Sequence, residues 1–249
     1  MEKNFDLGVI LFAYNEKDNL YKLLDKIIIN LYEFERINRL FISICIQGDK
    51  EAIDDIDKIR LKNKDKNKLS IDFQYYQKPQ GIKKSFLSSY EGLPTNIEHF
   101  LTMDCDLNHD PNDCLNFFNY LDKGYDVVIG SRYIYGGKIL GMSKWKVVLS
   151  YCFNYLISIY LRFDVFDKTS GFRLIKTKNM IDTIKKTSSE GFPFYAEFLL
   201  HLKREGKKIV ESPIIFKSRT KGISKMKIFK TIVDYLVLLK IIFTNRIKS

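Results

Sequence analysis

The sequence has few of the residues that mark several common classes of protein. It contains four cysteines and three histidines, and neither set shows the paired spacing of a zinc site. The cysteines are scattered and lie mostly in apolar patterns, so we expect reduced thiols, which are typical of a cytosolic protein. Only 5 of the 249 residues are proline and 45% are hydrophobic, so the chain can bury a sizeable core.

Long hydrophobic runs are also missing. No segment reaches the roughly 20 consecutive apolar residues of a membrane-spanning helix. The chain begins with charged residues and then enters an apolar run, so we expect no signal peptide. Internal repeats are absent as well. These absences argue against a secreted, a repetitive or a membrane-spanning protein.

Positive charge is in excess, with 41 basic against 30 acidic residues and a net charge of +11. Such an excess suits nucleic acid, anionic lipid or a phosphorylated substrate as a partner. Part of it lies in a lysine-rich stretch over residues 60–68, which alternates charged and amide side chains and lacks aromatic residues. We interpret this stretch as a solvated loop, with an RNA-binding strip as the alternative.

Apolar runs and helical spacings alternate through the first 130 residues. Continuous apolar runs predict buried strands over residues 7–13, 40–46, 71–76, 99–103 and 126–130. Helical spacing predicts helices over residues 19–31, 83–93 and 113–121. This alternation predicts an α/β fold with a mostly parallel sheet and helices on both faces.

The most informative segment is Phe-Leu-Thr-Met-Asp-Cys-Asp-Leu-Asn-His-Asp-Pro over residues 100–111. An apolar run ends there in Asp104 and Asp106, and side chains two residues apart on a strand lie on the same side. Two carboxylates held together repel each other unless a cation lies between them or one of them is protonated. A hard divalent ion with open positions for phosphate oxygens would resolve this conflict. The alternative is a solvated turn after a strand.

Other polar segments also follow predicted strands, namely residues 14–16, residues 47–49 and Gly81. In parallel sheets with helices on both faces, ligands bind beyond the carboxyl ends of the strands. These segments and the two aspartates therefore fall where the predicted sheet would bind a ligand.

After residue 130 the pattern changes. Residues 147–161 form a nearly uncharged apolar stretch, in which Ser150, Asn154 and Ser158 recur every fourth residue as a polar stripe. Its length suits a helix that lies in a membrane interface, with Trp145 at the level of the headgroups. A second such segment covers residues 228–243, whose charged residues would each cost about 2.5–3.5 kcal/mol at a bilayer centre. The alternative for both segments is ordinary core or a dimer interface.

The order of the motifs resembles the polyprenyl-phosphate sugar synthases of the dolichol-phosphate mannose synthase type, within the family 2 glycosyltransferases. Residues 13–20 look like the family's opening Tyr-Asn-Glu-x-x-Asn-Leu, and residues 103–111 look like its Met-Asp-Ala-Asp-Leu-Gln-His-x-Pro segment. Further motifs follow in family order: residues 130–133, residues 136–137, Trp145 with Ser150 and Asn154, residues 169–173, residues 191–192, Glu197, residues 211–216, and Arg219 with Gly222, Ser224 and Lys225. The resemblance covers about residues 7–227.

The resemblance implies a GT-A (Rossmann-like) domain over residues 1–227, with an inserted amphipathic helix at about residues 144–163. A C-terminal amphipathic membrane-interface helix would follow over residues 228–249. Mg²⁺ or Mn²⁺ would be held by Asp104, Asp106 and Asn108, the last of which stands where the family usually has Gln.

The resemblance also assigns the substrate-binding residues. The catalytic residues would be Asp104, Asp106, Arg132 and Asp167. The nucleotide-sugar donor would be bound by Ala13, Tyr14, Asn15, Glu16, Gln47, Asp49, Gly81, Lys84, Arg219 and Lys225. Arginine suits a phosphate because its planar fork meets phosphate oxygens in pairs.

The chain departs from the family pattern near the predicted donor site. Ile46-Gln47-Gly48-Asp49 stands where relatives carry Asp-Asp-Gly-Ser, and Lys83 takes the second glycine position of a Gly-x-Gly pattern. Val147 and Tyr151 stand where relatives often have basic residues. The base, the sugar and the acceptor clamp therefore stay open, with GDP-mannose as the favoured donor.

We therefore expect inverting transfer of a sugar to a polyprenyl phosphate by a protein peripherally associated with the cytoplasmic face of a membrane. A phosphate is already ionised at neutral pH, so no strong base is needed. Asp167 would act as a base if the acceptor were a hydroxyl, and its alternative role is a helix or turn cap. The rival hypotheses are transfer to a glycan or lipid hydroxyl and a non-catalytic membrane-associated relative. We expect no nucleic-acid partner and leave open a small membrane-protein partner.

Overall fold

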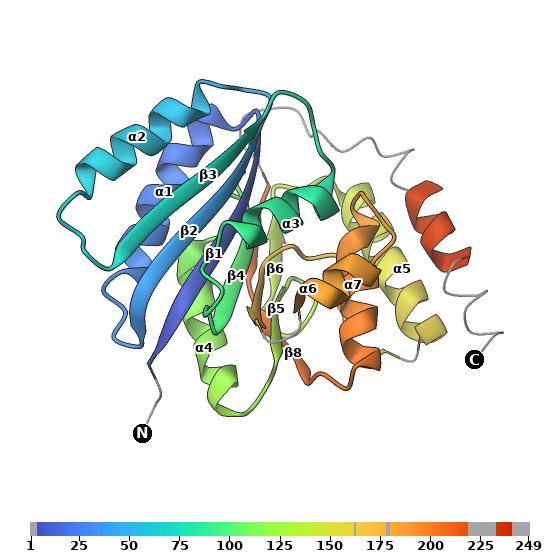
Figure 1. Ribbon diagram of the computed structural model, residues 1–249. Helices are drawn as coiled ribbons and strands as arrows, with labels where there is room; N and C mark the ends of the chain where they lie inside the picture. Colours follow the sequence, from blue (N-terminus) through green and yellow to red (C-terminus); the bar gives the residue numbers. More distant parts are fainter. Residues whose placement is uncertain (1–3, 162, 178–179, 219–232, 241–249) are drawn as a thin grey trace.

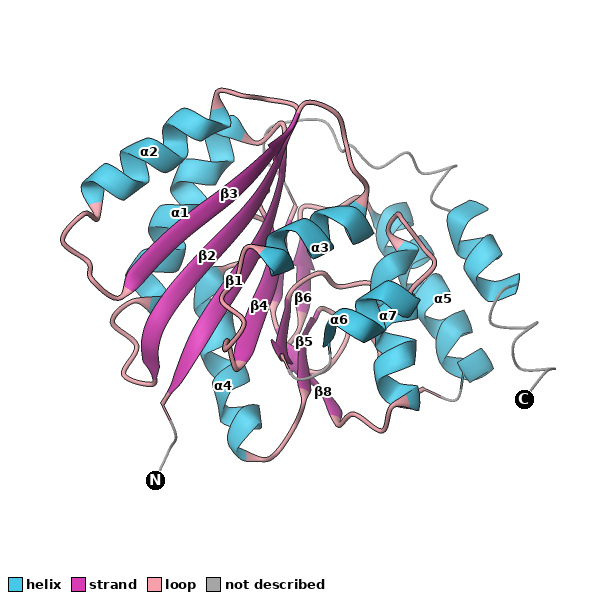
Figure 2. Cartoon of the chain, in the orientation of Figure 1, coloured by secondary structure: helices cyan, strands magenta, loops and turns pink. Residues whose placement is uncertain are grey.

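A seven-stranded sheet with helices on both faces forms the centre of the molecule (Figure 1, Figure 2). The computed structural model describes residues 4–161, 163–177, 180–218 and 233–240. In sheet order, the strands are β3 (Leu69–Tyr76), β2 (Ile37–Gln47), β1 (Phe5–Tyr14), β4 (His99–Asp104), β7 (Arg173–Lys176), β5 (Val127–Ser131) and β8 (Ile209–Pro213). All neighbours pair in parallel except β7, which runs antiparallel to β4 and β5. The predicted α/β fold with a mostly parallel sheet is confirmed.

Two layers of helices enclose this sheet. The helices are α1 (Lys17–Leu31), α2 (Ala52–Lys62), α3 (Ile82–Glu91), α4 (Leu115–Asp122), α5 (Lys144–Leu161), α6 (Met180–Lys186) and α7 (Pro193–Arg204), with a 3-10 turn, η1 (Pro111–Cys114), before α4. Buried side chains of α1, α2 and α4 pack with one face of the strands. Side chains of α3, α6 and α7 pack with the other face. The small parallel pair of β6 (Lys138–Leu140) and β9 (Ile215–Lys217) lies outside the main sheet.

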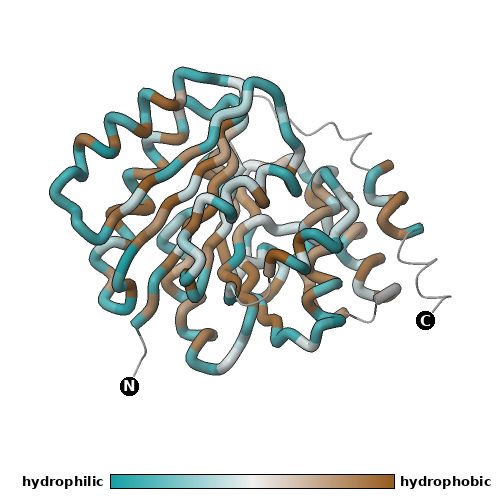
Figure 3. The backbone as a smooth tube through the Cα atoms, viewed as in Figure 1, coloured by the Kyte–Doolittle hydropathy of each residue, from teal (hydrophilic) through white to brown (hydrophobic). Residues whose placement is uncertain are grey.

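The core follows directly from the pattern of the sequence. Along β1, Val9 and Leu11 point into the cluster under α1, whereas Ile10 points into the cluster under α3. A strand covered on both faces needs apolar residues at every position, which is why β1 and β4 are continuous apolar runs. Hydrophobic residues are accordingly concentrated on the central strands (Figure 3). Each fully buried large aliphatic side chain contributes about 1.5–3 kcal/mol.

The lysine-rich stretch at residues 60–68 corrects one expectation. Its first three residues belong to α2, and only the remainder forms turns. Ile56 and Ile59 of α2 are completely buried, and the Nη2 atom of Arg60 donates to the main-chain oxygen of Ile71 over 2.5 Å. The surface charges of α2 concealed its narrow apolar stripe, so the helix was not predicted.

Helix α5 and residues 233–240, which are also helical, form a third layer beside α7 (Figure 1). Ile157 of α5, Leu200 of α7 and Leu238 share a small apolar cluster, and the rings of Phe153 and Tyr235 lie 3.8 Å apart between centroids. None of the helices in the described ranges is both long enough and apolar enough to span a membrane. The rest of the predicted 228–249 segment lies outside the described residues, and the division at residue 227 stays a prediction.

Candidate active site

One edge of the sheet collects the polar segments that the sequence places after its strands. Tyr14 pairs with Gln47 across β1 and β2, and Phe12 pairs with Asp104 across β1 and β4. Because β4 and β5 are both antiparallel to β7, they run in the same direction, so Arg132 leaves β5 at this same edge. The structure therefore brings together the predicted segments after β1, β2, β4 and β5.

Asp104 and Asp106 lie at the end of β4 in a tight turn. Leu107 has a φ of 60°, which turns the chain back so that Asp106 accepts two hydrogen bonds from Asn108. These bonds come from the main-chain nitrogen over 3.1 Å and from the side-chain nitrogen over 2.7 Å. The Oδ1 atom of Asn108 is buried and has no hydrogen-bond partner among the described residues. Burial, aided by the charges of Asp104, Glu16 and Asp106, raises the pKa of the Cys105 thiol.

The ligand set at this turn fits a divalent cation. It offers two carboxylates and one unpartnered carboxamide oxygen, and oxygen ligands of this kind suit Mg²⁺ or Mn²⁺. The described ranges hold no group of three or more His, Cys, Asp or Glu side chains that would form a complete metal cage. A site with two carboxylates keeps coordination positions for phosphate oxygens, as magnesium sites in phosphate chemistry do.

Gly171 allows a tyrosine from α7 to approach the same aspartates. The hydroxyl of Thr102 donates to the carbonyl of Gly171 over 2.6 Å and fixes this loop against β4. A Cβ atom at Gly171 would lie 3.0 Å from the Tyr195 hydroxyl and 3.5 Å from Oδ1 of Asp104. Burial, followed by the charge of Asp104, raises the pKa of Tyr195, so its hydroxyl stays a proton donor. No pattern in the sequence points to Tyr195, because only the packing of α7 brings it here.

The segment after β1 occupies the expected position. Tyr14 is 36% exposed, and Asn15 adopts a φ of 50° beside Gly48 of the next strand end. Glu16 is buried and accepts a hydrogen bond from Asn19 over 2.7 Å at the start of α1. Ala13 is buried beneath the edge, so its side chain supports the site from the core.

Gln47 has a different place from the one expected of a donor ligand. Its side chain is buried, where its Nε2 atom donates to Ser85 over 2.8 Å and its Oε1 atom accepts from the main chain of Gln80 over 2.8 Å. The amide of Gln47 is therefore used to hold the loop that leads into α3. Asp49, which accepts from the main chain of Glu51 before α2, is partly exposed.

Gly81 and Lys84 are exposed at the start of α3, where Gly81 has a φ of 82°. This backbone conformation favours glycine. Arg219 and Lys225 lie outside the described residues.

Arg132 and Asp167 form a buried ion pair beside this edge. Asp167 is completely buried and accepts from Arg132 through its Nε and Nη2 atoms, both over 2.7 Å, and through its main-chain nitrogen over 3.1 Å. Burial opposes the charge of both groups, but their attraction and hydrogen bonds outweigh it, so the pKa of Arg132 is raised and that of Asp167 is lowered. Asp167 thus holds the guanidinium in place, which differs from both the base and the cap expected from the sequence.

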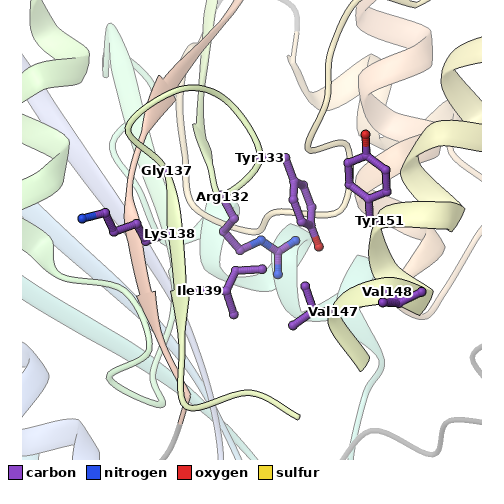
Figure 4. Close-up of a pocket in the computed structure, with 8 residues that line it drawn as sticks. All are labelled: Arg132, Tyr133, Gly137, Lys138, Ile139, Val147, Val148 and Tyr151. Atoms are coloured by element: carbon purple, nitrogen blue, oxygen red, sulfur yellow. The ribbon is translucent and has the colours of Figure 1, made fainter. Parts of the chain in front are cut away.

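An open pocket of about 390 Å³ lies in front of this guanidinium (Figure 4). It is lined by Arg132, Tyr133, Gly137, Lys138, Ile139, Val147, Val148 and Tyr151. The guanidinium points toward the space between Ile139 and Val147, whereas Lys138 points away from it (Figure 4). The hydroxyl of Tyr133 donates to Ser150 over 2.7 Å. The pocket therefore offers mostly apolar walls and one cation, which suits an anionic head attached to an apolar chain.

The polar stripe of α5 faces the protein, and its apolar side faces outward. Asn154 accepts from the main-chain nitrogen of Lys168 over 2.8 Å, and Ser158 is bonded to the ammonium group of Lys168. Six large side chains on the opposite side are 50–60% exposed: Trp145, Val148, Tyr151, Tyr155, Leu156 and Ile159. The helix prediction is confirmed, and the structure adds the direction of each face.

Several known proteins are similar to this chain in sequence or in fold. The model of Glycosyl transferase family 2 matches residues 95–182, a segment that contains Asp104, Asp106, Arg132 and Asp167. This match covers about a third of the chain and contains a family 2 glycosyltransferase signature. It is 25% identical to polyprenol monophosphomannose synthase of Mycolicibacterium smegmatis, over 88% of this chain and 80% of that protein. It is 28% identical to dolichol-phosphate mannosyltransferase of Pyrococcus furiosus, over 92% of this chain and 61% of that longer protein.

Solved structures of glycosyltransferases share the fold of this domain. Glucosyl-3-phosphoglycerate synthase from Mycobacterium tuberculosis, solved with Mn²⁺, UDP and phosphoglyceric acid, has a TM-score of 0.59 at 15% identity, covering 88% of this chain and 72% of that one. A mannosyltransferase from Pyrobaculum calidifontis, solved with GDP-Man and Mn²⁺, has a TM-score of 0.59 at 11% identity, covering 99% of this chain and 65% of that one. The family 2 match and the named relatives support glycosyltransferase activity.

Proposed function

We propose that this glycosyltransferase moves a sugar from a nucleoside-diphosphate sugar, with GDP-mannose favoured, to the phosphate of a polyprenyl lipid and inverts the anomeric carbon. The observation that carries the proposal is the guanidinium of Arg132, fixed by Asp167 at the inner end of a mostly apolar pocket. Such a pocket suits a lipid phosphate better than a free sugar hydroxyl, because a hydroxyl acceptor gives no reason to place a cation there. The two named mannose-transferring relatives point to the same substrate class.

The donor would lie along the edge formed by β1, β2 and β4. Asp104, Asp106 and Asn108 would hold Mg²⁺ or Mn²⁺, which offsets the charge that develops on the leaving diphosphate. Tyr14, Asn15, Glu16 and Asp49 would line the nucleoside pocket, with Gly81 and Lys84 at its rim. Gln47 would support this pocket through the loop before α3. Arg219 and Lys225 are proposed to contact phosphates.

The acceptor phosphate would bind to Arg132. Because Nε and Nη2 of Arg132 donate to Asp167 and Thr169, the phosphate would be met by Nη1, and at neutral pH that phosphate already carries the charge it needs to attack the anomeric carbon. No general base is then required, which agrees with the complete burial of Asp167 and its engagement by Arg132. Transfer to a hydroxyl would need an accessible carboxylate, and Asp167 is not accessible in this arrangement.

The lipid tail of the acceptor would stay in a membrane that the protein contacts through α5. The exposed apolar side of α5 continues from the wall of the pocket, where Val148 and Tyr151 belong to both. An interfacial helix buries such a face among lipid headgroups and upper acyl chains. We propose peripheral binding at the cytoplasmic face, in which the pocket opens at the level of the lipid phosphate. A small membrane-protein partner would bind this same side.

The test is a transfer assay with purified protein, Mn²⁺ or Mg²⁺, a short polyprenyl phosphate and a panel of GDP- and UDP-sugars. Mass analysis should detect a metal-dependent glycosyl-phosphoryl lipid, and the product would name the sugar. The Asp104→Asn/Asp106→Asn variant should abolish it, whereas the matched Asp54→Asn/Asp57→Asn variant on α2 should not. Donor hydrolysis without a lipid product would favour a hydroxyl acceptor. No donor binding with either metal would favour a non-catalytic relative.

A further inference from the structure

Lys168 is a completely buried lysine whose polar atoms all have partners. Its ammonium group contacts the hydroxyl of Ser158 over 2.5 Å, the main-chain oxygen of Asn154 over 3.4 Å and the main-chain oxygen of Val165. Its main-chain nitrogen donates to Asn154, and its main-chain oxygen accepts from Arg173 over 2.8 Å. One residue thus joins the second half of α5 to the loop between α5 and β7.

Lysine is almost never completely buried unless its charge is paired, so a lysine is an unusual residue for a site whose role is only structural. Burial lowers the pKa of Lys168 to about 8, although the charges of Glu211, Asp167 and Asp164 favour its ammonium form against that of Lys203. The ring of Phe163 lies 5.5 Å from the ammonium group of Lys168 and 4.4 Å from that of Lys203. A methionine of similar length would fill much of this space without burying a charge, but it would remove the donor that Ser158 and Val165 now have. The charge therefore calls for another explanation.

The position of Lys168 in the chain suggests one. The next residue toward the N-terminus is Asp167, which fixes Arg132, and Glu211 accepts the main-chain N–H groups of Phe166 and Asp167 over 2.8 Å each. The loop is therefore held by the sheet on one side through Glu211 and by α5 on the other side through Lys168. A movement of α5 against the sheet would reach Asp167 through this lysine, and a second route runs from Asn154 to Thr169, which is bonded to Arg132 and Asp167.

We propose that Lys168 is a positioning residue that couples helix α5, and the membrane contact made by its outer face, to the guanidinium of Arg132. This inference rests on the proposed function and adds a route by which lipid contact would control the acceptor half of the site. The donor half lies at the ends of β1, β2 and β4, whose positions are set by the core under α1 and α3. Its affinity should therefore be independent of this contact.

The kinetic test compares Lys168→Met with the matched control Lys176→Met, which removes an exposed lysine at the end of β7. Lys168→Met should lower kcat/KM for polyprenyl phosphate by roughly tenfold and leave the KM of the nucleotide sugar unchanged. Ser158→Ala removes one partner of the ammonium group and should give a smaller effect of the same kind. Expressed as free energies, the loss of kcat/KM in the double variant should be smaller than the sum of the two single losses, because the two residues contact each other. Equal losses for both substrates, or an acceptor kcat/KM within about twofold of the wild type, would overturn the proposal.

A second measurement needs no activity. Relative to the wild type, Lys168→Met and Ser158→Ala should both show faster hydrogen exchange over residues 154–169. Exchange in α1 should not change, because only the first segment depends on Lys168. Unchanged exchange over residues 154–169 would overturn the inference even if the enzyme transfers sugar as proposed. If the wild type transfers no sugar, the proposed function fails while the exchange result still decides whether Lys168 fixes α5. Should Lys168→Met fail to fold, Ser158→Ala decides both measurements.

Discussion

Helices α1 and α5 are oriented in opposite ways, and α5 has the larger share of apolar residues. α1 buries Leu20, Leu23, Leu24 and Ile27 completely against the sheet and turns its lysines to solvent. α5 turns Ser150, Asn154 and Ser158 toward the protein and leaves its large apolar side chains exposed. The first helix is held by apolar burial and the second mainly by hydrogen bonds. The outer face of α5 is therefore an exposed apolar surface, as the proposed membrane contact requires.

The difference also separates two halves of the site. The proposed donor edge is formed by strand ends whose position is set by the core under α1 and α3. The proposed acceptor pocket is formed by Arg132, β6 and α5, and its geometry depends on a few polar contacts to the loop over residues 163–169. The first half should therefore be rigid and the second should respond to what α5 contacts.

The largest expected effect comes from an identical truncation in the two helices. Ile27→Ala in α1 removes a completely buried side chain and should lower the free energy of unfolding by about 2–5 kcal/mol. Ile159→Ala in α5 removes a side chain that is 60% exposed and should change it by less than about 0.5 kcal/mol. Urea unfolding measures both changes. Equal losses in the free energy of unfolding would show that the outer face of α5 is covered within the folded protein. The two helices would then not differ in orientation as described.

A second pair of substitutions tests how much the polar stripe of α5 contributes to stability. Asn154→Ala leaves the buried main-chain nitrogen of Lys168 without an acceptor and should cost about 1–3 kcal/mol. Asn30→Ala in α1 removes only a surface bond to the main-chain oxygen of Lys26 and should be nearly neutral. Urea unfolding would again give the two values, with circular dichroism to confirm that the helix content is kept. A neutral Asn154→Ala would mean that apolar contacts, rather than the stripe, hold α5.

The sequence predicted the central sheet well because its signal is local. β1 and β4 are buried on both faces, so a continuous apolar run is enough to identify them. Asp104 is the last residue of β4, whereas Asp106 lies in the following turn, and the register of β1 with β4 and β2 brings the other segments to them. The apolar runs, together with the rule that ligands bind beyond the carboxyl ends of parallel strands, were therefore enough to predict the proposed donor edge.

The acceptor half could be predicted only in part, because its contacts join distant residues. The stripe on α5 was visible in the sequence, but its direction depends on Tyr133 and Lys168, which lie on other segments. The partner of Asp167 is Arg132, 35 residues earlier, and no spacing rule links them. Tyr195 reaches Asp104 only because α7 packs beneath Gly171, where the absent Cβ leaves room for its hydroxyl.

A pH titration tests the buried charge under α5. The pKa of Lys168 is lowered by burial from 10.5 to about 8, so between these values the unfolded chain binds more protons than the folded one. The contribution of this residue to the free energy of unfolding should therefore rise with pH across that window and stay constant below about pH 8. The measurement is the free energy of unfolding of the wild type and of Lys168→Met from neutral pH to pH 10. The difference between the two proteins at each pH gives the contribution of Lys168. A difference that stays flat, or falls with pH, would show that the ammonium group is not desolvated.

The smallest expected effect concerns the outer face of α5 itself. Trp145 is the single tryptophan of the chain, lies in the first turn of α5 and is about half exposed, so its emission reports on this helix without labelling. Vesicles of phosphatidylcholine and phosphatidylglycerol should shift that emission to shorter wavelength, because the indole moves from water into the headgroup region.

Tyr155→Ser and Leu156→Ser should each weaken vesicle binding by a few-fold, whereas Ile29→Ser, at an exposed apolar position on α1, should not. Equal weakening by Ile29→Ser would mean that exposed apolar area alone drives binding. Unequal weakening would identify the inverted orientation of α5 as the cause, since both helices expose large apolar side chains and only α5 gathers them on one continuous side.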